Sequence, residues 1–239
     1  MENEEIVKTE GGELTVFDPT ANFSPDENFE GVTPRLPKIS ILHTAQMFEV
    51  EEEKVDEFVG VVVDTNLVNA FWEKSFSETG GGSIPDCSSM DGERPERGEN
   101  IQSQTCASCP KNAFGSDGKG GKACKNMRRL HILLPGDFLP TRLTMTSSSF
   151  RSWGDYMTEL SKKQLKYFYA RTKFSLEKAF NKGGIEFSKL KFELVEPIST
   201  KAEDDIIQGM RKQMNVQMRK EDIQGEEYIP KEKSESDPF

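Results

Sequence analysis

The chain has 239 residues, of which 34% are hydrophobic and 30% are charged, and its formal net charge at pH 7 is −10. This length fits one ordinary domain with tails or two small domains, and the composition argues against a compact enzyme with a large buried centre. No apolar run reaches membrane-spanning length and the acidic N-terminus lacks a signal-peptide pattern, so we expect a cytoplasmic protein.

The charge is distributed unevenly along the chain. Residues 106–191 carry 17 basic and 6 acidic side chains, whereas residues 1–60 carry 15 acidic and 4 basic ones. A basic segment between acidic arms is typical of a polyanion-binding domain, in which the arms compete for the basic surface. The alternative is that some lysines only solvate a helix face, as Lys162, Lys163 and Lys166 would.

Residues 1–37 are predicted to form an acidic, largely disordered arm, because their few apolar side chains are scattered among Glu, Asp, Asn and Pro. A folded domain is expected over residues 38–200. Residues 38–44 alternate as a strand does, residues 58–63 form a β-branched run, and residues 67–74 are the expected partner strand after a turn at 64–66. Gly60 within the second strand suggests a bulge or tight bend.

The segment 75–127 is predicted to be an insertion that contains all four cysteines of the chain: Cys87, Cys106, Cys109 and Cys124. The pair Cys106 and Cys109 is spaced so that two thiolates can face one ion, and the other two would complete a tetrahedral site. The segment is too poor in large apolar residues to form a core, so a structural Zn²⁺ would provide the missing cross-link. An iron–sulfur cluster or a redox-active cysteine pair remains as an alternative.

Around these cysteines, the stretches 85–92, 106–116 and 120–125 resemble sequence blocks shared by a set of uncharacterised phage and prophage proteins. The resemblance implies a phage setting, hence the cytoplasm of an infected or lysogenic bacterial host. A zinc module inserted in an oligonucleotide-binding (OB) barrel is also similar in arrangement to the helix-destabilising protein of T-even phages. That family's metal site includes a histidine and this insertion has none, so no residue roles are carried over.

Further strands are predicted at 128–134 and 142–146, followed by a helix at 150–163. Residues 167–180 and 185–195 should form a long hairpin, with a bulge near Lys189 where apolar residues change faces. An amphipathic helix is expected at 201–220. The sequence therefore predicts a mainly β fold with helices (α+β), as an OB-like antiparallel barrel with an inserted four-cysteine zinc loop; an open α+β sheet is the alternative.

Nucleic-acid binding is predicted where cations and aromatic rings occur together, because single-strand binders need charge along a groove and rings on which bases stack. Phe114 is placed either against the metal or against a base, and Trp153 in the core. The residues predicted to bind are Trp72, Lys74, Lys111, Lys122, Lys125, Arg128, Arg129, Arg142, Arg151, Tyr167, Tyr169, Arg171 and Lys173.

Residues 221–239 form a polar acidic tail that ends in Asp237, Pro238 and Phe239. A terminal ring on a solvated tail cannot serve a core, so we interpret it as a partner-docking tip. The arrangement resembles the C-terminal tip of bacterial single-stranded DNA-binding proteins, which in that family recruits other genome-maintenance proteins. The resemblance implies replication or recombination proteins as partners.

Together these features favour a single-stranded DNA-binding protein of phage replication or recombination, with little sequence preference. The alternative is a zinc-stabilised interaction or transcription-regulating factor without such a preference. Catalysis is not expected, since His43 and His131 are the only histidines and no nuclease motif or phosphate loop occurs.

Overall fold

A computed structural model describes residues 6–8, 14–16, 35–74, 84–180, 184 and 186–214. The chain divides into two units, Met1–Thr33 and Pro34–Phe239. In the first unit, β1 (Ile6–Lys8) and β2 (Leu14–Val16) pair antiparallel, which gives local structure to part of the predicted arm. The predicted docking tip, Asp237 to Phe239, lies outside the described residues.

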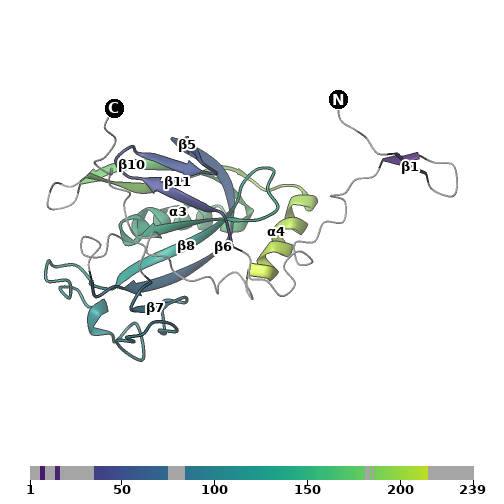
Figure 1. Cartoon of the computed structure of the whole chain (residues 1–239). Helices are drawn as coiled ribbons and strands as arrows, with labels where there is room; N and C mark the ends of the chain where they lie inside the picture. Colours follow the sequence, from purple (N-terminus) through teal and green to yellow (C-terminus); the bar gives the residue numbers. More distant parts are fainter. Residues whose placement is uncertain are drawn as a thin grey trace, which may run out of the picture. The chain divides into compact units, whose positions relative to one another are not determined.

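The second unit is mainly β, with two helices and a strongly curled mixed sheet that forms a half-barrel (Figure 1). Its nine strands follow the order β11-β10-β6-β8-β9-β3-β4-β5, with β7 paired to β6. Their bounds are β3 (Lys38–Leu42), β4 (Met47–Val50), β5 (Glu53–Val55), β6 (Glu57–Phe71), β7 (Cys87–Ser89), β8 (Lys125–Leu133), β9 (Thr141–Thr146), β10 (Ala170–Phe180) and β11 (Glu186–Pro197).

The predicted antiparallel barrel is corrected in two respects. β3 pairs parallel with β9, which makes the sheet mixed. Between the described strands, no pairing joins β11 to β5, so the sheet curls without closing. The sequence fits both outcomes, because the alternation of apolar residues along a strand is the same in a closed barrel and in a curled open sheet.

β6 is one strand of 15 residues, whereas two strands and a turn were predicted for this region. The expected turn is instead an irregularity in the pairing with β8, between Val62 and Asp64. Thr65 and Asn66 stay within the strand because their side chains hydrogen-bond to the backbone oxygens of Arg129 and Met90. Remote partners therefore satisfy polar residues that resemble a turn in the sequence.

The main core lies on the concave side of the sheet, around α3 (Phe150–Lys162). Figure 1 shows α3 between the two arms of the curled sheet. Trp153, as predicted, joins this core together with Tyr156 and Leu160, and they pack with strand residues such as Phe174. A helix at this place was predicted within one residue of its bounds.

α4 (Lys201–Met214) packs its apolar stripe of Ile207, Met210 and Met214 into a second core cluster with Val61 and Val63 on β6. Only the first 14 residues of the predicted helix 201–220 fall within the described residues. None of the described helices is long and apolar enough to cross a membrane.

The long hairpin is confirmed, since β10 and β11 pair antiparallel along their length. Two details differ from the prediction. Tyr167–Tyr169 forms a 3-10 turn, η3, before the strand begins, and the pairing irregularity lies between Arg171 and Thr172. No bulge forms near Lys189, since β11 pairs with β10 without a shift from Glu186 to Leu194. The Lys189 ammonium lies 5.8 Å from the ring centroid of Phe187, which is on the same face of the strand.

Candidate metal and nucleic-acid site

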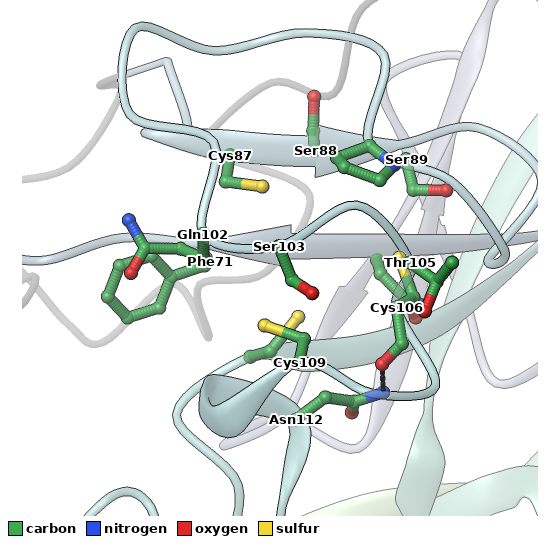
Figure 2. A pocket seen from close by; sticks show the side chains of 13 residues that line it. Phe71, Cys87, Ser88, Ser89, Gln102, Ser103, Thr105, Cys106, Cys109 and Asn112 are labelled. Carbon is green, nitrogen blue, oxygen red and sulfur yellow. Dashed lines mark hydrogen bonds between the residues drawn. The ribbon is translucent and has the colours of Figure 1, made fainter.

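All four cysteines line one pocket, at the place where the insertion meets the end of β6. Figure 2 shows Cys87, on β7, on one side of this pocket and Cys106 and Cys109 on the other. β7 pairs with β6 so that Cys87 lies opposite Phe71. The cavity measures about 20 Å³, which is room for one water-sized species.

The pocket brings the four thiols together, but they are not arranged as a metal-binding group. Within the described ranges, no group of three or more His, Cys, Asp or Glu side chains is arranged to hold a metal ion. Burial and the neighbouring thiols raise the pKa of Cys124 to about 12. Burial also raises the pKa of Cys87; a backbone hydrogen bond at Gln102 opposes this rise, and the thiols of Cys106 and Cys109 add to it. A divalent cation reverses this effect, because it stabilises the thiolate forms.

A loop that we call the finger, residues 110–124, extends from this pocket. Cys109 precedes it and Cys124 ends it. It begins with the 3-10 turn η1 (Pro110–Asn112), and the N–H of Cys124 donates to the carbonyl of Lys111 at 2.8 Å, which closes its base. Asn112 Nδ2 donates to the Cys106 carbonyl at 2.8 Å (Figure 2). Backbone groups of two predicted ligands, Cys106 and Cys124, therefore hold the base of the finger in place.

Phe114, on the finger, is 84% exposed and does not line the thiol pocket. Of the two positions considered for this ring, the one against the metal is therefore not adopted. The Lys122 ammonium lies 5.0 Å from its ring centroid. Lys111, by contrast, lies 4.9 Å from the ring centroid of the buried Phe71.

A row of cations and rings runs from the finger along β8 to η3. Lys122 Nζ donates to Asn126 Oδ1 at 3.0 Å, and Arg128 lies on the same face of β8, two residues further on. Arg128 Nη1 donates to Thr65 Oγ1 at 3.2 Å. The pKa of Arg128 lies below its ordinary value because of partial burial, which the interaction with Tyr167 opposes only in part.

α4 contributes the last cation of this row. Arg211 Nη1 donates to the Tyr167 hydroxyl at 3.2 Å and to the Val63 carbonyl at 2.6 Å, and its guanidinium carbon lies 3.7 Å from the Phe168 ring centroid. We call Lys122, Arg128, Tyr167 and Arg211 the cationic stripe. The ion pairs formed between described side chains include none of its three cations.

The cations predicted on the hairpin are in a different state, because each is paired with carboxylates. Arg171 pairs with Glu196 and Glu203. Lys173 pairs with Glu193 at 2.9 Å and lies 3.8 Å from Glu57. Their charge is therefore largely compensated within the molecule.

Tyr169, also predicted to bind, is engaged by α4, since Gln208 Nε2 donates to its hydroxyl at 2.9 Å. Arg171 and Lys173 thus share one face of β10, as predicted, whereas Tyr169 precedes the strand in η3. Each of the three has a partner within the chain.

Two predicted binding residues are buried, which corrects their placement on a surface. Arg129 is 1% exposed and Arg142 is 3% exposed. Arg129 follows Arg128 along the strand and so points to the opposite face, where its Nη1 lies 3.8 Å from Met90 Sδ. A nucleic acid cannot reach either guanidinium without rearrangement of the fold.

The other predicted residues are distributed over several elements. Lys74 and Arg151 are exposed, at the end of β6 and in the first turn of α3. Trp72 is partly buried against a cluster that contains Met90 and Met127. Lys125 Nζ donates to the Lys122 carbonyl at 3.3 Å, which places it beside the finger.

Arg211 was missed by the sequence analysis. It lies between Met210 and Met214 of an amphipathic helix, where a basic residue usually marks only the polar face. No pattern in the sequence shows that α4 packs beside η3, so its position required the structure. Comparisons of this chain with protein-family models, with curated proteins and with solved structures gave no match.

Proposed function

We propose that this protein binds single-stranded DNA with little sequence preference, in phage replication or recombination, and that it is not an enzyme. The cationic stripe carries this proposal. Its three cations are held by neutral partners, namely amide, hydroxyl and carbonyl oxygens, and so they retain charge for phosphates. Tyr167 lies among them as a ring beside which a base can lie.

The charge pattern supports a polyanion as ligand. The hairpin cations Arg171 and Lys173 are paired with carboxylates, whereas no ion pair between described side chains includes a stripe cation. We propose an OB-like site as the finer description of this surface: a curled sheet with Arg128 on one face of β8 and an inserted loop between β6 and β8. Rings next to cations favour a single strand over a duplex, whose bases are stacked inside and unavailable to side chains.

We also propose that the thiol pocket binds one structural Zn²⁺ through Cys87, Cys106, Cys109 and Cys124. Four thiols around one cavity are the donors that zinc prefers in structural sites. A four-thiolate sphere leaves no open position for catalysis, so the ion would stabilise the insertion. One zinc per purified chain is the expected stoichiometry, and a chain free of zinc after expression with zinc would contradict the proposal.

The acidic tail supports a further part of the proposal, which is recruitment of replication or recombination proteins through Asp237, Pro238 and Phe239. Removal of these three residues should leave DNA binding intact and abolish capture of such partners. Equal capture by the full-length and shortened chains would refute this part.

Substitution of single stripe cations tests whether this surface binds the single strand. Lys122→Gln and Arg128→Gln should each weaken binding to a fluorescent oligo-dT and reduce the slope of log K against log salt by about 0.7. Lys162→Gln removes the same charge from the exposed side of α3 and is the matched control. If the control weakens binding as much as the stripe variants, only net charge matters and the stripe is not the site.

A further inference from the structure

The exposed ring on the finger has no role in the fold. Phe114 is 84% exposed, and the residues around it include Gly115, Ser116 and Asp117, which offer it no apolar contact surface. A single exposed apolar side chain is common on protein surfaces and needs no explanation by itself. What distinguishes this ring is its place on a hydrogen-bonded loop beside a cation.

The finger is held rigid without a core of its own. The N–H of Gly115 donates to the Gly121 carbonyl at 2.7 Å, and the N–H groups of Lys119 and Gly121 each donate to Asp117 Oδ1 at 2.8 Å. Ser116 Oγ donates to the Lys111 carbonyl and accepts from the N–H of Ala123. The ring is thus presented by an ordered loop, which lowers the entropy lost when it binds.

The ring is accompanied by a fixed cation. Lys122 Nζ, 5.0 Å from the Phe114 centroid, also donates to Asn112 Oδ1 at 3.2 Å and to Asn126 Oδ1 at 3.0 Å. The ammonium lies over one face of the ring, so a base can stack on the other face while a neighbouring phosphate meets the ammonium.

We propose that the finger is a base-stacking arm for single-stranded nucleic acid, with Phe114 as the stacking ring and Lys122 as the phosphate contact. This inference rests on the proposed function, because it extends the cationic stripe beyond β8. Lys111, Lys119 and Lys122 outnumber the single acidic residue of the finger, Asp117, which fits a polyanion. A lipid surface is disfavoured because one ring among glycines offers little apolar area to insert.

Phe114→Ala tests this directly. It should reduce affinity for oligo-dT about 5- to 150-fold, the range for loss of one base stack, and leave the salt slope unchanged because no charge is removed. Phe114→Tyr should retain most of the affinity. The melting temperature should stay that of the unsubstituted chain, since the ring makes no core contact.

Phe180→Ala is the matched control, because Phe180 is 62% exposed at the end of β10 and also has a lysine, Lys178, 5.8 Å from its ring centroid. That lysine pairs with Glu186 at 2.7 Å, so its charge is compensated. This control should bind oligo-dT as the unsubstituted chain does.

Three outcomes would overturn the inference. If the unsubstituted chain binds oligo-dT and Phe114→Ala binds it equally well, the finger is not a stacking arm although the proposed function stands. If the unsubstituted chain does not bind single strands, both fail. If it binds phosphatidylserine vesicles and only that binding depends on Phe114, the ring serves a membrane.

Discussion

Arg128 and Arg129 show how much depends on the direction of one side chain. They are neighbours on β8, yet Arg128 reaches Thr65 on the side that carries Lys122, whereas Arg129 is buried near Met90. The two residues have the same charge and adjacent positions in the sequence. Only the pairing of β8 with β6 decides which of the two can meet a phosphate.

Gly60 is the residue at which the sheet tolerates no side chain. A Cβ at this position would lie 2.5 Å from Ile132 Cγ2 and 3.1 Å from the Leu133 carbonyl oxygen. Ile132 is fully buried and cannot move aside. Gly60→Ala should therefore lower the free energy of unfolding by about 1–3 kcal/mol in urea titrations, the usual cost of overpacking.

Gly154→Ala provides the control for this substitution, because nothing lies within 4 Å of the added Cβ and the residue is in α3. Alanine in a helix is favoured over glycine by about 1 kcal/mol, so this variant should gain stability. A Gly60→Ala variant as stable as the unsubstituted chain would contradict the close approach of β6 and β8.

At the level of elements, α4 has two roles: it packs against β6 and it contacts the tyrosines of η3. Its inner stripe packs against β6, and its polar residues contact η3: Gln208 reaches the Tyr169 hydroxyl and Arg211 the Tyr167 hydroxyl. Arg211 also meets the carbonyl of Val63, where the pairing of β6 with β8 is irregular. The helix thus satisfies a carbonyl beside the irregularity while it places a cation next to a ring.

The order of the insertion is also expected to depend on its thiols. If zinc holds its base, Cys106→Ser should lose most of the bound zinc and expose residues 84–124 to proteolysis, because the segment has few apolar contacts of its own. Ser108→Ala, two residues away, removes an exposed hydroxyl that contacts Thr105 and Ser103 and should keep one zinc per chain. Equal zinc contents and equal proteolysis patterns in the two variants would refute the thiolate site.

The sequence was sufficient to predict elements whose signal is local. α3, the β10–β11 hairpin and the cysteine insertion follow from periodicity, turn residues and spacing. The single strand β6 could not be predicted, because Asp64, Thr65 and Asn66 resemble a turn until the remote hydrogen-bond partners of Thr65 and Asn66 are known. The same holds for η3, where three aromatic residues looked like the start of a strand.

At the level of the whole molecule, the cations of the basic segment 106–191 occur in three different states. Arg129 and Arg142 are buried, Arg171 and Lys173 are paired with carboxylates, and the two stripe cations of this segment, Lys122 and Arg128, keep neutral partners. Composition predicted that cations gather in this segment, but it could not show which are available. That division depends on the curl of the sheet and on where α4 packs, both of which are long-range properties.

The central claim is that a single strand follows the cationic stripe, and a salt titration with oligo-dT and a duplex of equal length tests it most directly. With three stripe cations and about 0.7 counterions released per contact, log K for oligo-dT should fall against log salt with a slope of about −2. At every salt concentration the single strand should bind more tightly than the duplex. Absence of binding to oligo-dT at low salt, or equal affinity for the duplex, would contradict the account.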